Sequence, residues 1–485
     1  MLSVPGTRGS PHSRLIDAAT LGVFLLLIAA LSHQLLPALV DDSFIYLRIA
    51  ANIANGDGWV YNLGENANAA TSVLYTLLLV AVGILTGFDA NTLAIAYGVT
   101  LYALLVVQYL AWRESDGWIA AVTIALGSGM SARLLGSFGM ECALLLTLVS
   151  ATALAFRHHG DNWRVGLLVG LTALTRPEGI IVLGVIGLIV LSHRRIAWRS
   201  VSVATLSVLP WLLFATLVFG SPMSQTAAVK AAQRHYGWWA TQPDFAVGFL
   251  LQPRWAWLTL GLAAAGIVIA WSRSRKHDPF AIVCIGFGAL QVPGYQFLDA
   301  PLGYDWYFAP GNFSADLAIL LAGISLLRLL ASRLRSPVGS QAVTAIGALA
   351  LLLAISRIGM APAAVPGSYG LSAQYRVGAE WLRTHAQPED SVAATEIGYI
   401  GWYSGLRVLD IHGLIHPHAL PALRERNLHW WYDLGERPRF VVTHIPAWHG
   451  EPGSEQTWPQ ALSEDFASQY TVVFEHDILR IHERR

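Results

Sequence analysis

Two adjacent aspartates, Asp41 and Asp42, stand directly after a long apolar stretch that runs from Ala18 to Val40. Carboxylates at a membrane border are costly unless water, a metal ion or a basic side chain meets them. An enzyme that acts on a lipid-borne substrate would need a general base at such a place. The pair is therefore the first candidate for chemistry in this chain.

Further ionisable and polar residues stand near the ends of apolar segments, and the predicted topology puts them on the same side as the aspartates. They are Arg48, Arg133, Glu141, Arg176, Glu178, Lys230, Arg234, His235, Asp299, Asp305 and Tyr307. Structural roles stay open for them. Asp42 could cap a helix, Glu141 could start one, and Arg176 could pair with Glu178 where a proline breaks a helix. The same holds for Lys230, Arg234, His235, Asp305, Glu396, Asp410 and His412.

The composition indicates which class of protein must position these residues. The chain has 485 residues, of which 54% are hydrophobic and 13% charged, whereas soluble domains carry about 25% charged residues. The sequence therefore predicts a polytopic protein embedded in a lipid bilayer. Its 31 basic and 31 acidic residues cancel, so no strong field points to a nucleic acid partner. With two cysteines, a disulfide framework is not expected.

Apolar segments of the length needed to cross a bilayer predict about eleven spans. They lie near 15–39, 91–112, 117–136, 139–157, 163–178, 180–192, 198–220, 255–271, 279–298, 311–330 and 341–358. Basic loops favour the cytoplasm, which puts the N-terminus and four basic loops inside. This topology requires the apolar segment 71–87 to stay at the opposite face instead of crossing. We therefore predict a first outer loop, residues 40–90, with juxtamembrane helices.

The composition changes after Gly370, where tryptophans, prolines and charges become frequent. Residues 371–386 predict an amphipathic helix. The segment SVAATEIGYIGWYSGLRVLDI predicts a strand, a turn and a second strand, and YTVVFEHDILRIHE predicts a terminal hairpin. A linker, APAAVPGSYG, precedes them. The predicted fold is a mainly α transmembrane bundle at 1–360 and a small outer α/β domain at 370–485.

The first outer loop, DDSFIYLRIAANIANGDGWVYNLGENANAATSVLYTLLL, resembles that of the GT-C superfamily of membrane glycosyltransferases. The similarity is greatest to its arabinofuranosyltransferase-like and mannosyltransferase-like branch. The shared features are an acidic pair, an aromatic residue, an arginine and an N-x-G-E turn, here Asp41, Asp42, Phe44, Arg48, Asn62, Gly64 and Glu65. Less specific matches are GMECALL, LTRPEGII and FGSPMSQTAAVK, the last without the Asn-Thr that often precedes the lysine in relatives.

The resemblance implies a polyprenyl-phosphate-linked sugar donor and inversion at the anomeric carbon. The acceptor would be a cell-envelope glycan or glycoprotein outside a bacterial inner membrane. Asp41 is the expected general base, and Asp42 is the alternative. Cations would stabilise the leaving phosphate, and the expected substrate-binding residues are Arg48, Glu141, Arg176, Glu178, Lys230, Arg234, His235, Asp305 and Tyr307. Asp42 and Glu141 could also share a divalent cation such as Mg²⁺ or Mn²⁺.

Three other functions stay open at the level of sequence. A transporter or flippase of lipid-linked sugars would also need ionisable residues within the membrane, but no internal repeat of the usual kind is visible in the sequence. A ligase that joins preassembled glycans would share the fold and differ in its acceptor. A glycan-binding scaffold without activity would tolerate the loss of the Asp41 carboxylate.

Overall fold

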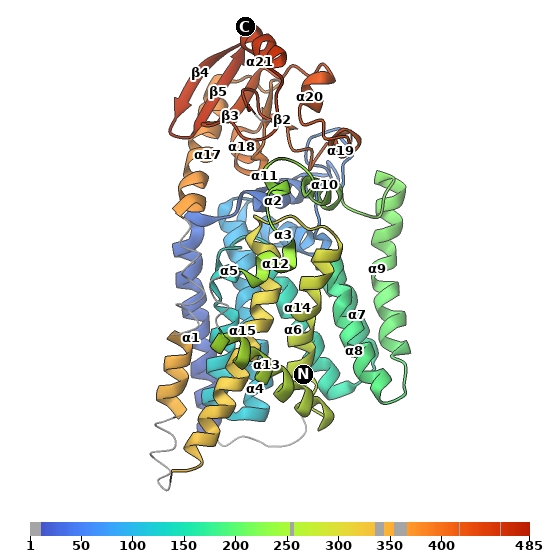
Figure 1. The fold of residues 1–485 in the computed structure, drawn as a ribbon, viewed down its shortest axis with the longest axis vertical. Coiled ribbons are helices and arrows are strands. Elements are labelled where there is room, and N and C mark those ends of the chain that lie inside the picture. Colours follow the sequence, from blue (N-terminus) through green and yellow to red (C-terminus); the bar gives the residue numbers. More distant parts are fainter. Residues whose placement is uncertain (1–10, 253–256, 335–343, 354–365, 417, 456) are drawn as a thin grey trace.

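The protein has a long helical bundle at one end and a small sheet domain at the other (Figure 1). The computed structural model describes residues 11–252, 257–334, 344–353, 366–416, 418–455 and 457–485. A layer of short helices, which includes α2 and α10, lies between the bundle and the sheet domain (Figure 1). This layer carries most of the candidate residues of the first outer loop.

Seven helices of the described residues are long and apolar enough to cross a membrane. They are α1 (Pro11–Leu35), α4 (Ala90–Gly129), α6 (Cys142–His159), α9 (Trp198–Phe219), α13 (Trp257–Arg275), α14 (Phe280–Phe297) and α15 (Asp305–Ala331). Helix α4 contains two predicted spans, because Gly117 (φ 79°, ψ 175°) interrupts it with a non-helical turn. The protein is therefore a multi-pass membrane protein, as predicted.

Shorter apolar helices account for the remaining predicted spans. They are α7 (Trp163–Thr175), the 3-10 turn η2 (Pro177–Ile180) with α8 (Ile181–Ser192), and the helix Thr344–Leu353. Arg176 lies between α7 and η2 in an extended conformation (φ −152°, ψ 138°). The helical conformation is thus interrupted at Arg176, as the neighbouring proline predicts.

The first outer loop contains two helices, α2 (Asp41–Asn55) and α3 (Val73–Thr86), after the single turn η1 (Leu36–Ala38). At 1.5 Å per residue, the 14 residues of α3 extend about 21 Å, which is short for a hydrocarbon core of about 30 Å. Helix α3 packs against α2, α4 and α7. The apolar segment 71–87 therefore forms a helix at the end of the bundle, beside the helix that carries the aspartates.

The other short helices lie close to the same end of the bundle. They are α5 (Ala132–Leu135), α10 (Gln225–Gln233), α11 (Gly237–Ala240) and α12 (Phe245–Leu250). Ser224 caps α10, since its hydroxyl accepts a hydrogen bond from the backbone N–H of Ala227. The buried residues of α10 include Thr226, Val229 and Lys230, so helical spacing turns the lysine inward.

The sheet domain begins with α17 (Pro366–His385), whose residues 371–385 match the predicted amphipathic helix. Its strands are β1 (Ser391–Ala394), β2 (Arg407–Asp410), β3 (Phe440–His444), β4 (Tyr470–His476) and β5 (Leu479–Arg484), in the order β2-β1-β3-β5-β4. Its further helices are α18 (Ile397–Ser404), α19 (Ala419–Arg424), α20 (Trp430–Asp433) and α21 (Gln460–Gln469). Strands β4 and β5 form the predicted antiparallel hairpin.

The prediction of a strand, a turn and a second strand at 391–411 is wrong for its middle part, where a helix replaces the turn. Strands β1 and β2 are parallel, and parallel neighbours need a crossover instead of a tight turn. Helix α18 supplies that crossover between them. The first half of the predicted linker, residues 361–365, lies outside the described residues, and its last five residues belong to α17.

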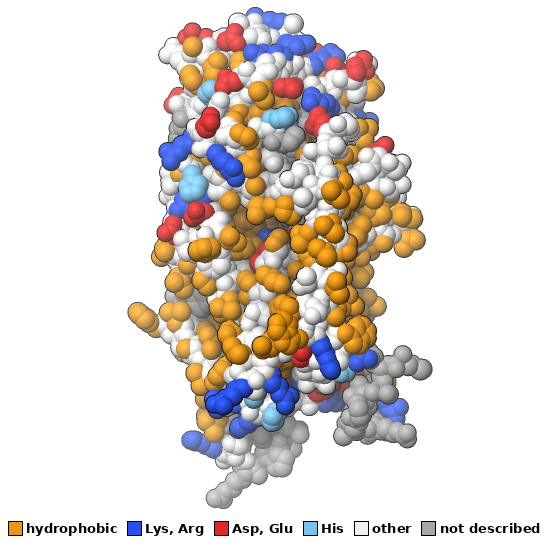
Figure 2. Space-filling view, turned by 90° about the vertical axis from the view of Figure 1, so that its right-hand side faces the viewer, with side chains coloured by type: hydrophobic (Ala, Val, Ile, Leu, Met, Phe, Trp, Pro, Cys, Tyr) orange, Lys and Arg blue, Asp and Glu red, His pale blue; other side chains and the backbone are white. Residues whose placement is uncertain are grey.

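The surface of the bundle agrees with a lipid environment. Figure 2 shows a broad hydrophobic band around the helical part, with basic side chains gathered at its lower end and charges of both signs around the sheet domain. The most apolar window of α9 is only 11% buried. The basic side chains at the lower end of the bundle thus lie away from α2, the helix that carries the aspartates (Figure 1).

Candidate active site

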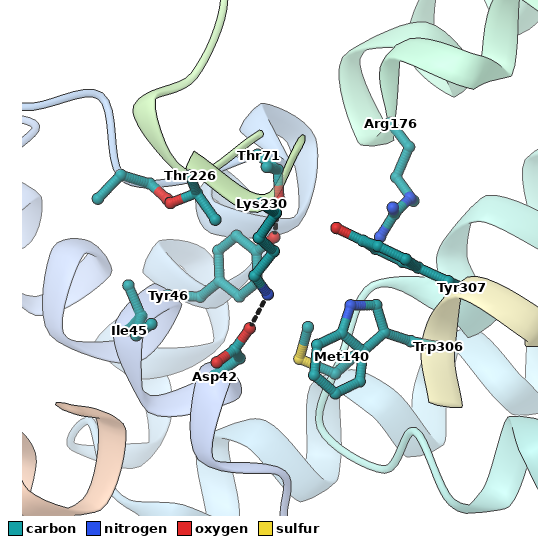
Figure 3. A pocket seen from close by; sticks show the side chains of 11 residues that line it. Asp42, Ile45, Tyr46, Thr71, Met140, Arg176, Thr226, Lys230, Trp306 and Tyr307 are labelled. Atoms are coloured by element: carbon teal, nitrogen blue, oxygen red, sulfur yellow. Dashed lines mark hydrogen bonds and ion pairs between the residues drawn. The ribbon is translucent and has the colours of Figure 1, made fainter. Parts of the chain in front are cut away.

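A polar pocket lies where α2 meets α10 and the start of α15. The empty space between its walls, part of which is open to solvent, is about 320 Å³. Its walls come from segments far apart in the sequence, and Figure 3 shows Asp42 and Lys230 facing Tyr307 and Arg176 across it. The lining residues are Asp42, Ile45, Tyr46, Ala69, Thr71, Met140, Arg176, Thr226, Lys230, Trp306 and Tyr307.

Asp42 and Lys230 form an ion pair inside this pocket. The Lys230 Nζ donates to Asp42 Oδ2 at 2.6 Å, and the side chains of Lys230 and Asp42 are 4% and 18% exposed. Burial opposes the charged ammonium, but the neighbouring Asp42 carboxylate outweighs this effect and raises the pKa of Lys230. Lys230 is therefore positively charged inside the pocket.

Aromatic rings surround the Lys230 ammonium. Its Nζ lies 4.0 Å from the ring centre of Tyr304 and 4.9 Å from that of Trp306. Ring faces attract a cation within about 6 Å. The rings thus stabilise the lysine without neutralising it, and leave its charge available to an anion.

Arg176 brings a second cation to the opposite wall of the pocket. Its guanidinium forms ion pairs with Glu141 and Glu178 and donates to the Tyr295 hydroxyl at 2.7 Å. Its Cζ lies 5.2 Å from the ring centre of Tyr307. The two glutamates lie behind the arginine and are not among the pocket-lining residues. Their ion pairs hold the Arg176 guanidinium in place, and the side of the guanidinium that faces away from them lines the pocket.

Asp41 points away from the pocket toward the sheet domain. Its Oδ2 and Oδ1 accept hydrogen bonds of 2.8 Å from the backbone N–H groups of Gly398 and Tyr399, at the start of α18. Burial raises the pKa of Asp41 to about 6, against the effect of these two donors. Adjacent residues on a helix point in different directions, so α2 presents its two carboxylates to different regions.

Arg48 also contacts the sheet domain. Its Nη1 donates to the Gly401 carbonyl at 2.7 Å and its Nη2 to the Leu406 carbonyl at 2.9 Å. The guanidinium lies 4.5 Å from the ring centre of Tyr61. Arg48, one of the expected substrate-binding residues, is not among the pocket-lining residues.

Several other expected residues also lie outside the pocket lining. Asp305 pairs with Arg133. Arg234 donates to Asp244 at 2.8 Å. His235 is half exposed, with its Nε2 3.6 Å from Asp299. The pocket thus brings together Asp42, Arg176, Lys230 and Tyr307 from the predicted set.

Glu396 is a functional candidate that the sequence did not distinguish from a structural residue. It immediately precedes α18 and its carboxyl lies near that of Asp41. Burial, and then the neighbouring Asp41 and Asp42, raise the pKa of Glu396 well above its usual value. A single glutamate in a soluble-looking segment has no pattern that reveals such a neighbourhood.

The aromatic lining was also missed, apart from Tyr307. Tyr46 and Trp306 line the pocket, and the Tyr46 hydroxyl is hydrogen-bonded to that of Thr71. Dense aromatic residues in GYDWYF were the available signal, but aromatic residues at a membrane border are commonly interfacial anchors.

The two candidate metal ligands, Asp42 and Glu141, each form an ion pair with a basic side chain. Asp42 pairs with Lys230 and Glu141 with Arg176. Among the described residues no group of three or more His, Cys, Asp or Glu side chains could hold a metal ion.

Solved structures of other membrane proteins share this architecture. ArnT from Cupriavidus metallidurans bound to undecaprenyl phosphate superimposes with a TM-score of 0.60, at 14% identity and over 98% of both chains. Its apo state gives 0.57 at 14% identity, over 96% of this chain and 98% of that one. The chain therefore has the GT-C fold, as the resemblance of its first loop implied.

Two comparisons of the sequence, one with protein families and one with known proteins, add to the structural comparison. A family model described as a domain of unknown function, DUF8728, matches residues 368–483. The chain is also similar to a terminal β-(1→2)-arabinofuranosyltransferase of Corynebacterium glutamicum, at 25% identity over 290 residues. This match covers 52% of the present chain and 41% of that relative, so it spans less than half of the relative's length.

Proposed function

We propose that this protein is an inverting glycosyltransferase that moves a sugar from a polyprenyl-phosphate donor to an acceptor hydroxyl. The observation that carries the proposal is the pocket in which Asp42 meets Lys230 at 2.6 Å, with Arg176 on the opposite wall. One carboxylate and two cations suit a reaction in which a hydroxyl loses a proton while a phosphate leaves. The GT-C fold supports the same chemistry by analogy.

The reaction requires one bond to form and one to break. The acceptor oxygen attacks the anomeric carbon, and the bond from that carbon to the phosphate oxygen breaks with its electron pair on the phosphate. Asp42 accepts the hydroxyl proton. Lys230 and Arg176 stabilise the charge that gathers on the leaving phosphate. Attack opposite to the leaving group inverts the anomeric carbon, as in inverting glycosidases.

Asp42 is the better candidate for the base in this geometry, and the assignment of Asp41 stays untested. Asp42 lines the pocket, whereas both oxygens of Asp41 accept backbone N–H groups of α18. The Lys230 ammonium pairs with the Asp42 carboxylate before substrate binds. A donor phosphate competes for this lysine, and its arrival releases Asp42 for proton transfer.

The finer features follow from the same proposal. The donor would enter from the lipid, past the aromatic and apolar residues at the border of the pocket. Basic side chains gather at the lower end of the bundle (Figure 2), away from α2 and α10, which carry Asp42 and Lys230 (Figure 1), and basic loops favour the cytoplasm. The active site would then face the extracytoplasmic side of a bacterial inner membrane. Its acceptor would be a cell-envelope glycan or a glycoprotein, and a divalent cation such as Mg²⁺ or Mn²⁺ is an additional factor to be tested.

The test is transfer by the purified full-length protein from defined polyprenyl-phosphate sugars, with arabinofuranose and mannose as the first two. A deletion strain is analysed in parallel for envelope glycans and lipid-linked sugars. We expect the donor to accumulate and one sugar to be lost from the envelope glycans. Unchanged envelope sugars together with altered movement of lipid-linked sugars across the membrane would contradict transfer and favour a flippase.

A further inference from the structure

Helix α18 of the sheet domain meets a charged residue of α2 at each of its ends. The backbone N–H groups of Gly398 and Tyr399 donate to Asp41 at its start. The first N–H groups of a helix have no partner within it, and its N-terminus favours negative charge. Asp41 therefore satisfies both the hydrogen bonds and the dipole of a helix from another part of the chain.

Arg48 meets the C-terminal end of the same helix. It donates to the carbonyls of Gly401, in the last turn of α18, and of Leu406, just beyond it. The last carbonyls of a helix favour positive charge. Asp41 and Arg48 are two helical turns apart on α2 and thus share one side of it. The eight residues of α18 fit between these two charges.

Two glycines let the helices approach closely enough for these contacts. A Cβ on Gly398 would lie 1.9 Å from the carbonyl oxygen of Asp41, and one on Gly401 would lie 1.8 Å from the Tyr61 hydroxyl. Between them Phe44 packs on Tyr399, with 4.4 Å between the ring centres. The interface has no room for other residue types at its two glycines.

The sheet domain also holds the helix that carries Lys230. The Gln225 side chain, at the start of α10, donates to the carbonyls of Gly413 and His416 at 3.2 and 3.0 Å. The Thr226 hydroxyl is hydrogen-bonded to the carbonyl of Leu414 at 3.3 Å. The sheet domain thus contacts two helices of the layer below it. Its helix α18 binds α2, and its residues 413–416 bind α10.

We propose that the sheet domain positions the active site, with Asp41 and Arg48 as positioning residues that clamp α18 and thereby hold Asp42 against Lys230. The effect on transfer rests on the proposed function, whereas the clamp itself does not. A displacement of about 1 Å at reacting groups can reduce a rate by about 100-fold. The domain is therefore part of the active site, although its side chains do not line the pocket described above.

The clamp is tested first without any activity measurement, by amide hydrogen exchange of the full-length protein in nanodiscs. Asp41→Asn and Arg48→Gln should each speed exchange in α18 by about tenfold or more, because local opening becomes easier. The control is Arg480→Gln, which removes an exposed ion pair with Glu475 in the same domain. Unchanged α18 exchange in both variants would overturn the clamp, whatever the protein catalyses.

Transfer then separates positioning from catalysis. If both residues act through α18, the double variant Asp41→Asn/Arg48→Gln loses hardly more kcat than the worse single variant, because coupled residues are not additive. Arg48→Lys, which keeps the charge, should recover part of the loss. Complete loss of kcat in Asp41→Asn with normal α18 exchange would overturn the positioning role and make Asp41 the base. Faster α18 exchange in both variants, together with no transfer by the wild type from any donor, would reject the proposed function and leave the clamp standing.

Discussion

The two sides of α2 serve different purposes, although Asp41 and Asp42 are neighbours in the chain. On the pocket side, Asp42 meets a lysine ammonium, which in the proposed function an incoming phosphate takes over. On the sheet-domain side, Asp41 meets backbone N–H groups that belong to a helix and cannot be exchanged for substrate. A carboxylate with exchangeable partners suits chemistry, and one with fixed partners suits assembly.

The largest effect is expected when the carboxylate on the pocket side, that of Asp42, is removed. Asp42→Asn should reduce kcat by about 10²- to 10⁴-fold, the range typical of a lost general base, and Asp41→Asn should cost less. Transfer rates of the two purified variants at saturating donor check this order. A larger loss for Asp41→Asn at normal α18 exchange would reverse the roles of the two aspartates.

The second prediction concerns the far wall of the pocket. Arg176→Gln leaves Glu141 and Glu178 without their cation in a buried place, which should lower the free energy of unfolding by about 3–5 kcal/mol. The matched control Arg234→Gln removes an ion pair with the exposed Asp244 and should cost less than about 1 kcal/mol. Thermal unfolding in detergent measures both. Equal losses would mean that the Arg176 network is not a buried structural unit.

A third test separates the two sides of α2 without changing a charge. Gly401→Ala places a Cβ against the Tyr61 hydroxyl and should reduce transfer by about 10- to 100-fold through displacement of α18. Gly378→Ala, in α17, first meets a leucine side chain at 3.3 Å and is the control. Adding Tyr61→Phe removes the clashing oxygen and should restore part of the rate. No difference between the two alanine variants would count against the clamp.

The smallest effect is a pH dependence on the clamp side. Burial raises the pKa of both Asp41 and Glu396, so the folded protein binds more protons than the unfolded chain. The contribution of these two carboxyls to the free energy of unfolding is therefore fully present below their pKa values in the unfolded chain. It is lost as pH rises through about 6, the pKa of Asp41 in the folded protein. The charged and titratable groups around Glu396 are Asp41, Asp42, Lys230, Tyr304 and Tyr375.

Glu396→Gln removes one of the two titrating carboxyls. Between about pH 5 and about pH 8, the variant should lose less stability than the wild type, and the difference should be on the order of 1 kcal/mol or more. Thermal unfolding at both pH values measures the difference. Identical pH profiles would show that Glu396 does not bind an additional proton in the folded protein.

Much of the architecture was predictable because it depends on local chemistry. Apolar length predicted the spans, and the charge of the loops predicted that 71–87 stays at one end, where α3 is now found. The break at Arg176 followed from the proline beside it. The crossover helix α18 was missed, because an apolar, glycine-containing segment of eight residues has no period long enough to distinguish a helix from a turn.

The sequence by itself determined that acidic and basic groups gather at one end of a membrane bundle, since burying them singly in lipid would be too costly. It could not determine which of them meet. Asp42 lies 188 residues from Lys230, and Asp41 lies 357 residues from Gly398. Adjacent residues on a helix differ in direction by about 100°, so the partner of each aspartate depends on what packs against each side of α2. The tertiary structure alone decided that one carboxylate faces a cation in a pocket and the other the end of a helix.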